Sequence, residues 1–233
     1  KIPLEPEYDI LQFIVDHGKL PSWKKDIIEI VRDESSYFIP QIQTKIMNEG
    51  WASYWHYTIL NELDLPSEWH LPFIKTHNQV IRPHIGGLNP YHVGFEIFQD
   101  IKEKYGIEEC FIARESSHDV AFIRQYLTRE KCEELGLFSF SHKRKKGYVI
   151  DDVSDDLGWE RVKKNLSKNI GTNTIPVIFV EEIEGKNTLI LRHEHDGRDL
   201  DLEHAEKVVH HVTYLWGAES KLFTNIEGEL WEI

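Results

Sequence analysis

The sequence has few of the features that mark disulfide-stabilised, cysteine-zinc and membrane proteins. Only two of its 233 residues are cysteines. Neither Cys110 nor Cys132 has a neighbouring cysteine at a metal-binding spacing, so the sequence predicts neither a disulfide framework nor a cysteine-based zinc module. No apolar run approaches the roughly 20 residues that cross a bilayer, and the first residues lack the order of a secretory signal. We therefore expect a cytoplasmic protein without a membrane span.

Positive charge is also scarce. The chain has 27 Lys and Arg against 40 Asp and Glu, a formal net charge of -13. This balance opposes attraction to phosphate backbones and to anionic membrane surfaces. The one basic run, residues 142–146, lies where we expect the tip of a hairpin, so a solvated turn is favoured over a nucleic-acid patch. We expect no nucleic-acid partner.

The short motifs of common enzyme classes are missing. The sequence contains no glycine-rich phosphate loop, no paired-cysteine zinc pattern and no His-Glu-x-x-His string. The first residue is Lys1 rather than methionine, and we expect that an amino-terminal portion precedes it. Nothing in the composition predicts an oligomeric state.

The residues that are present predict an α+β protein. Hydrophobic residues make up 40% of the chain and aromatic residues 12%, which is enough to bury a substantial core. Up to about residue 136 the apolar residues recur at helical spacing, and after it strand pairs alternate with helices. We expect an all-helical region, 1–136, followed by a smaller α+β domain, 137–233. The order ββαββαββ predicts a largely antiparallel sheet with helices on one face.

Proline and glycine set the expected boundaries in the helical region. Pro40 should end or kink a helix near Phe38, and the pattern then resumes from residue 40 to about 63. The pair Gly86-Gly87 predicts a loop with access to positive φ. Asn89 can cap the next helix, because Pro90 suits its first position.

The most unusual stretch is 44–57, where large aromatics, a glycine and two acid/base groups share a predicted helix. Glu49 and His56 are seven residues apart and return to nearly the same azimuth, with Ser53 between them on that face. Gly50 costs a helix about 1 kcal/mol relative to alanine, so it indicates close approach by another element or a local kink. A buried hydrogen-bonded pair is the plain alternative for Glu49 and His56.

Histidines and carboxylates flank the two unusual stretches, and they are candidate metal ligands. The set is His56, His84 and His92 with Glu34, Glu49 and Glu96. Hydrolytic metal sites use three such ligands and a water, whose pKa the metal lowers towards neutrality. His92 and Glu96, four residues apart, equally fit a surface pair. If these side chains converge in space, the cofactor that we expect is a divalent metal, with zinc favoured; if they do not, the sequence predicts no cofactor.

A second cluster follows a predicted strand, at 192–201. His193 and His195 would point to the same face of that strand, as metal ligands can. Asp196-Gly197 reads as a turn, however, and the alternating charges after it can pair at the surface. We favour the structural interpretation here.

Several uncommon strings together resemble the stage V sporulation protein R (SpoVR-like) family. They are Tyr37-Phe38 with Pro40-Gln41, the run from Thr44 to Ala52 with His56-Tyr57, Gly87-Leu88-Asn89-Pro90-Tyr91, and His193 to Leu200 with its Gly197-Arg198-Asp199-Leu200 ending. The resemblance covers nearly the whole chain. Members of the family are longer, and the resemblance implies that this chain corresponds to their carboxy-terminal half.

The resemblance implies a cytoplasmic bacterial protein linked to assembly of the spore cortex. The Asn48 to Ala52 string is similar to the helix that supplies a glutamate ligand in some helical zinc peptidases. By analogy, Glu49, with His56 as a further ligand or as general acid/base, would complete a metal site begun elsewhere in the protein. The first hypothesis is thus a metal-dependent, hydrolase-like protein. The alternative is a non-enzymatic scaffold or regulator that acts through protein partners.

Overall fold

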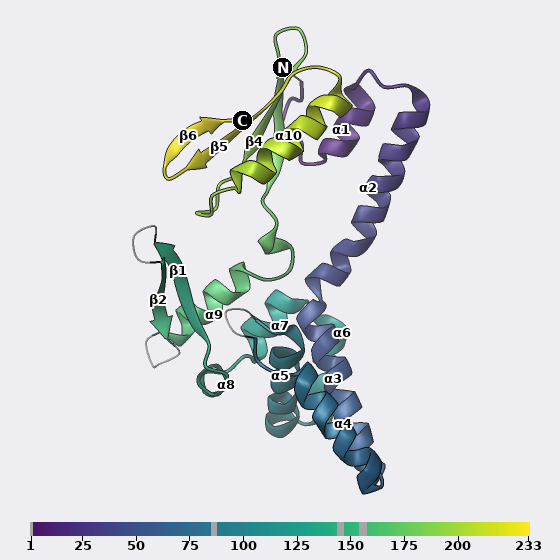
Figure 1. Cartoon of the computed structure of the whole chain (residues 1–233), viewed down its shortest axis with the longest axis vertical. Helices are drawn as coiled ribbons and strands as arrows, with labels where there is room; N and C mark the ends of the chain where they lie inside the picture. The colour runs from purple at the N-terminus through teal and green to yellow at the C-terminus, as the bar shows by residue number, and fades with distance from the viewer. Residues whose placement is uncertain (1, 85–87, 144–146, 154–157) are drawn as a thin grey trace. The chain divides into compact units, whose positions relative to one another are not determined.

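A computed structural model describes residues 2–84, 88–143, 147–153 and 158–233 of the chain. Within these residues the chain forms two compact units, Lys1–Phe38 with Ile175–Ile233, and Ile39–Thr174. The first unit therefore combines segments from both ends of the sequence (Figure 1). These bounds differ from the expected ranges 1–136 and 137–233, and a separately folding region 1–136 stays a prediction.

The element order agrees with the predicted class, helices first and then hairpins alternating with helices. The helices are α1 Ile10–His17, α2 Ser22–Gln43, α3 Lys45–Glu62, α4 Ser67–Val80, α5 Pro90–Tyr105, α6 Ile107–Ser116, α7 Asp119–Tyr126, α8 Arg129–Glu134, α9 Trp159–Lys168 and α10 Leu202–Trp216, with a 3-10 turn, η1, at Gly171–Thr174. The strands are β1 Phe138–Lys143, β2 Gly147–Val153, β3 Ile178–Glu184, β4 Thr188–His193, β5 Ser220–Ile226 and β6 Glu229–Glu232. The α+β class and the order ββαββαββ are confirmed.

The strands form two sheets rather than one. β1 and β2 make an antiparallel hairpin of their own, and the other four strands lie in the order β3-β4-β5-β6. β4 and β5 are parallel, whereas the two outer pairs are antiparallel. The parallel pair follows from chain connectivity, because α10 carries the chain from the end of β4 back to the start of β5. The expected basic tip of the first hairpin includes residues 144–146, which lie outside the described residues.

The core of the first unit lies between the four-stranded sheet and helices α1 and α10. Its fully buried side chains include Ile14 from α1, Val180 and Leu191 from the sheet and Trp216 from α10. The Trp216 indole N–H donates to the Asn187 carbonyl at 2.8 Å, so the ring is buried with its polar atom satisfied. Residues near both ends of the sequence thus share one core.

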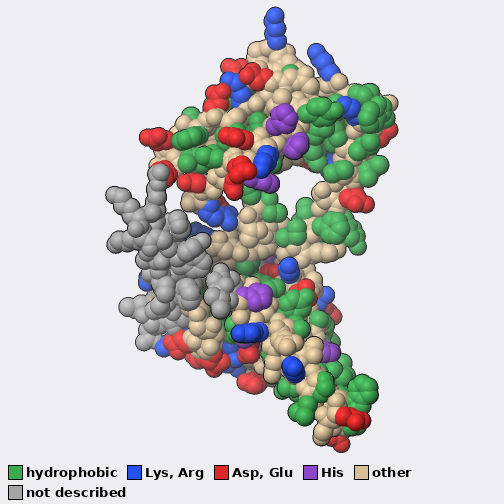
Figure 2. All heavy atoms as spheres, viewed as in Figure 1, with side chains coloured by type: hydrophobic (Ala, Val, Ile, Leu, Met, Phe, Trp, Pro, Cys, Tyr) green, Lys and Arg blue, Asp and Glu red, His purple; other side chains and the backbone are tan. Residues whose placement is uncertain are grey.

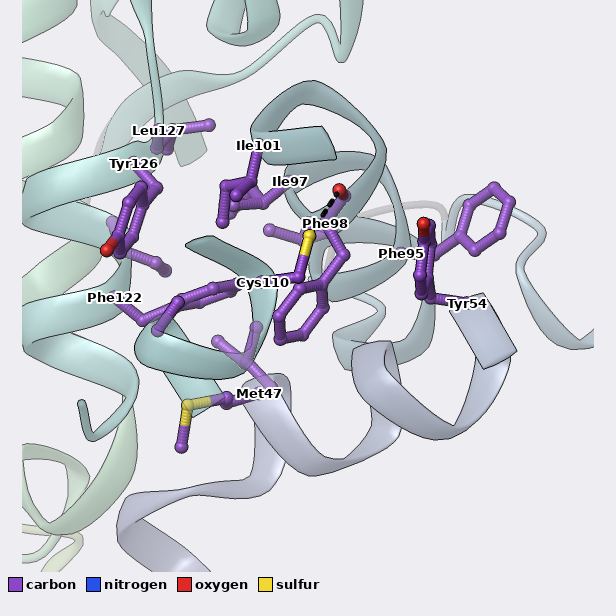
Figure 3. Packing of buried hydrophobic residues seen from close by; sticks show 14 of the residues in the cluster. Met47, Tyr54, Phe95, Ile97, Phe98, Ile101, Cys110, Phe122, Tyr126 and Leu127 are labelled. Carbon is purple, nitrogen blue, oxygen red and sulfur yellow. Dashed lines mark hydrogen bonds between the residues drawn. The ribbon is translucent and has the colours of Figure 1, made fainter. Parts of the chain in front are cut away.

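The core of the second unit is aromatic and centres on Phe98 of α5 (Figure 3). The Phe98 ring lies 5.3 Å from Trp51 of α3 and 4.9 Å from Phe122 of α7, centroid to centroid. Cys110 of α6 approaches the Phe98 carbonyl with its thiol, at 3.6 Å. Burial raises the pKa of Cys110 to about 11, so this thiol is a core group and not a nucleophile.

One of the expected helix boundaries differs in the structure. Pro40 lies inside α2, and the break comes four residues later, at Thr44, whose φ of -126° is not helical. The Thr44 hydroxyl donates to the Pro40 carbonyl at 2.7 Å. The predicted glycine loop falls on 85–87, outside the described residues. Asn89 and Pro90 begin α5 as predicted, and the Asn89 side chain accepts from the Tyr91 amide at 3.1 Å.

Among the described residues, no helix is both long enough and apolar enough to span a bilayer.

Candidate functional site

Helices α3 and α5 cross at two glycines, and this contact places the candidate side chains. A Cβ built on Gly50 would lie 2.4 Å from the Gly94 Cα, and a Cβ on Gly94 would lie 2.2 Å from the Ile46 carbonyl oxygen. The backbones therefore touch with no room for a side chain on either helix. The prediction that Gly50 marks a close approach is confirmed, and the approaching element is α5.

A buried carboxylate fixes the start of α3. The Asp119 side chain is 1% exposed and accepts hydrogen bonds from the backbone N–H groups of Ile46 and Met47, each at 2.9 Å. Burial raises the pKa of Asp119, and these hydrogen bonds to the ionised form work in the opposite direction. A negative charge at this position also favours the positive end of the helix dipole. Asp119 thus anchors the helix that carries Glu49 and His56.

Glu49 is partly exposed, and its partner comes from the start of α5. The Tyr91 side chain lies close to the Glu49 carboxylate, and this neighbour raises the pKa of Tyr91. Asn89 holds the backbone of this turn through its own side chain, which donates to the carbonyls of Val80 and Arg82 at 2.8 Å each. Glu49 therefore lies beside a side chain at the start of α5.

His56 lies at the surface, and its nearest candidate group is a second histidine from α4. The His56 ring lies 5.4 Å from the Phe73 ring and 6.4 Å from the His77 ring, centroid to centroid. His77 is 3% exposed, and the rings of Tyr57 and Phe95 lie 4.9 and 5.0 Å from it. His56 and His77 together form a histidine pair with one exposed and one buried member.

The buried histidine has an unsatisfied nitrogen. His77 Nε2 is shielded from solvent and has no hydrogen-bond partner among the described residues. Burial lowers the pKa of His77 and the neighbouring His56 lowers it further, so the ring is neutral near pH 7. A buried polar atom without a partner costs about 1–3 kcal/mol. Such atoms are uncommon in folded proteins, and this one needs an explanation.

Glu49 and His56 do not form one compact ligand pair. A helix rises about 1.5 Å per residue, so seven residues separate the two Cα atoms by roughly 10.5 Å along the axis. Zinc binds its carboxylate and imidazole ligands at about 2.0–2.2 Å. The two side chains would have to lie along the helix towards each other to share an ion. In the structure the Tyr91 side chain lies near Glu49, and the His77 ring lies near His56.

The remaining predicted ligands are spread over the chain. Glu96 of α5 forms an ion pair with Lys131 at 3.2 Å, and His92 lies one turn earlier with its Nδ1 buried and unpartnered. Burial lowers the pKa of His92, with Glu96 raising it and Lys131 lowering it. His84 is exposed before α5, and Glu34 is exposed on α2 in the other unit. No three His, Cys, Asp or Glu side chains gather in metal-binding geometry within the described part of the chain.

The second cluster, after β4, is a hydrogen-bonded network. His193 is buried, with Nδ1 2.8 Å from the Thr224 hydroxyl, and His195 Nε2 lies 2.9 Å from an Asp199 oxygen. Asp199 also accepts from the Glu227 amide at 3.2 Å. The two histidine rings are neighbours, 5.6 Å apart, although β4 ends at His193 and His195 lies beyond the strand. These partners join the end of β4 to the β5–β6 turn, in agreement with the structural interpretation.

Three residues at the site were not predicted from the sequence. His77 lies four residues after Phe73 in the sequence, and that spacing signals burial rather than a site. Tyr91 contributes to the family resemblance only as part of a string. No local signal links Asp119 to Ile46, because the two are 73 residues apart.

Comparisons with known proteins agree on one family. Residues 1–175 match the family model described as SpoVR like protein, and residues 175–225 match the SpoVR-like C-terminal domain. A curated protein of Escherichia coli (strain K12), described as "Uncharacterized protein YcgB", is 31% identical over 256 residues. The match covers 95% of this chain and 50% of that protein, so the chain spans about half the length of this relative. No solved structure matches the chain.

Proposed function

The chain belongs to the SpoVR-like family, and on that premise we propose that it is the carboxy-terminal half of a cytoplasmic bacterial protein acting in assembly of the spore cortex. We further propose that the protein is metal-dependent and hydrolase-like, and that the second unit supplies only part of the metal site. The remaining ligands would come from the polypeptide that longer members of the family carry. Zinc is the favoured ion, because imidazole suits it.

The observation that carries this proposal is the unpartnered Nε2 of His77 beside the exposed His56. A neutral imidazole binds a metal ion through its unprotonated nitrogen, and Nε2 of His77 has no other partner among the described residues. The ring centroids are 6.4 Å apart, somewhat longer than the roughly 5 Å that tetrahedral zinc geometry gives for two imidazoles. A small rotation of the exposed His56 side chain would close this difference. His56 and His77 fit two of the ligands.

Glu49 has a separate role in this proposal. Its carboxylate is on the His56 face of α3 but about two helical turns away, close to the Tyr91 side chain. A bound divalent ion would supply a water of lowered pKa. Glu49 is placed to accept a proton or to bind a further ligand at the edge of such a site. Gly50, Gly94 and Asp119 keep the helix that carries it in position.

Metal content measured by mass spectrometry tests the proposal. The sample is the full-length protein, that is, the polypeptide at the length of its relatives, purified without chelator. We expect near-stoichiometric zinc that is lost in the His56→Ala, His77→Ala double variant. His70→Ala is the matched control, because His70 lies on the same helix with its ring 5.9 Å from Phe73. Metal-free protein, or metal retained by the double variant, would overturn the proposal.

A second candidate function is a non-enzymatic scaffold or regulator with protein partners. It is favoured by the apolar surface where α3 ends and α4 begins. Large side chains are exposed there in the described structure, namely Ile59, Leu63, Trp69 and Leu71. Contiguous exposed apolar surface of this kind marks protein interaction sites. If the full-length protein is metal-free and still loses function when Trp69 and Leu71 are replaced by serine, that result would support the scaffold function over the metal-dependent one.

A further inference from the structure

Helix α2 is long, and little of it is covered. Of its 22 residues, Ile28 is the buried one. Its inner side is held to the first unit by polar contacts, in which Lys25 Nζ donates to the Val15 carbonyl at 2.5 Å and Arg32 binds Asp9 at 2.6 Å. A helix depends mainly on tertiary packing of its apolar face for stability. In the described part of the structure, the apolar side chains on the outer side of α2 are exposed.

The exposed apolar residues of α2 lie on one side of the helix. At 100° per residue, six of them from the first unit fall within an arc of about 120°. These residues, called here the α2 face, are Trp23, Ile27, Ile30, Val31, Tyr37 and Phe38, and each is at least half exposed. Figure 2 shows hydrophobic side chains gathered where Figure 1 places α2. An apolar arc of this width is the pattern of a helix that packs against a partner.

One charged residue lies in the middle of the α2 face. Glu34 falls at the centre of the arc, one turn after Ile30 and Val31. Burying it without a partner would be costly, so whatever covers the face must bring a basic group or hydrogen-bond donors to this carboxylate. Glu34, predicted from the sequence as a metal ligand, is better explained as a specificity element of this contact.

The occupant is indicated by the lengths of the proteins and by charge. The relative is about twice the length of this chain, and the SpoVR like match extends over residues 1–175, which include α2. A segment of the same polypeptide binds at high effective concentration. A second copy is disfavoured, because a two-fold contact through this face would bring two Glu34 carboxylates together in chains of net charge -13.

We infer that the α2 face docks the part of the polypeptide that longer members of the family carry beyond the half spanned by this chain, and that this part places a basic side chain against Glu34. The inference uses the same longer polypeptide as the proposed function, but it does not depend on any metal. The segment that covers α2 would hold the two halves of the protein together.

Hydrogen exchange of the α2 amides, 23–38, tests the inference on the 233-residue chain and on the full-length protein. We expect exchange at least tenfold slower in the full-length protein. Ile30→Asp should abolish this slowing and lower the melting temperature of the full-length protein, with little effect on the shorter chain. Leu230→Asp on β6 is the matched control, because Leu230 is 63% exposed and Ile30 is 61% exposed.

Two outcomes would overturn the inference. The first is equal exchange of α2 in the two proteins. The second is a dimer of the 233-residue chain that forms with concentration and is dissociated by Ile30→Asp, which would assign the face to a second copy. Neither readout involves metal content, so the inference and the proposed function fail independently.

Discussion

His77 is the residue at which stability and function are expected to conflict. Replacing it with phenylalanine keeps an aromatic ring against Tyr57 and Phe95 and removes the unpartnered Nε2. We expect His77→Phe to raise the free energy of unfolding of the 233-residue chain by about 1 kcal/mol at pH 7. Urea unfolding measures this change. A loss of stability would mean that Nε2 has a partner in solution, such as an ordered water.

The buried histidines also set the pH dependence of stability. Burial lowers the pKa of His77, His92 and His193, with Lys131 acting in the same direction on His92 and His195 on His193. The unfolded chain then binds more protons than the folded one below a pH of about 6.5, so stability falls as the pH drops through that value. We expect a lower melting temperature at pH 5.5 than at pH 7.5. His77→Phe should reduce the difference, and an unchanged difference would show that His77 is not responsible.

Asp119 is expected to be the most sensitive polar residue of the second unit. In Asp119→Ala the backbone N–H groups of Ile46 and Met47 lose a charged acceptor in a buried setting. We expect a loss of about 3 kcal/mol, from charge-assisted hydrogen bonds and helix capping together. Chemical denaturation gives the value. Asp201→Ala is a useful comparison, because Asp201 caps α10 at an exposed position through the His204 amide, and it should cost about 1 kcal/mol.

At the scale of the element, the α3–α5 crossing has no tolerance for a side chain. The atoms that an added Cβ on Gly50 would meet belong to the Gly94 backbone, so no flexible group can move aside. Gly50→Ala gains helix propensity but forces the two helices apart, and we expect a net loss of roughly 3 kcal/mol. Thermal unfolding should show it, with Ala52→Ser on the exposed side of α3 as the control. If Gly50→Ala left the stability unchanged, the two helices would not be in backbone contact.

Helical periodicity and the start signal of α5 at Asn89 and Pro90 were sufficient to predict most helices from the sequence. The order of the strands along the chain was also predicted, but their division into two sheets was not, because local turn signals do not show which strands pair. Pro40 was misjudged: the chain tolerates it inside α2, and the break occurs at Thr44. The pairing of His56 with His77 could not be predicted, since it depends on how α4 packs back on α3. The local sequence does not determine the angle at which α4 packs against α3.

At the scale of the whole molecule, the family match and the length of the relative change what the 233-residue chain is expected to do. The family models cover residues 1–225, so both units belong to the family. Two features lack a partner among the described residues. They are the Nε2 atom of His77 in the second unit and the exposed α2 face in the first. We propose that polypeptide carried in addition by longer relatives completes each feature. The metal and exchange experiments test these two explanations separately.

The first unit is made from 1–38 and 175–233, and this has a consequence for how the protein is synthesised. A ribosome releases residues 39–174 before the strands that complete the first unit, so the second unit can fold while translation continues. Helix α1 cannot bury Phe13 and Ile14 until Trp216 and Leu222 have emerged. During that interval its apolar residues are open to chaperones. Nascent chains halted before residue 216 should therefore bind a chaperone through residues 10–17, and those residues of completed chains should not bind it.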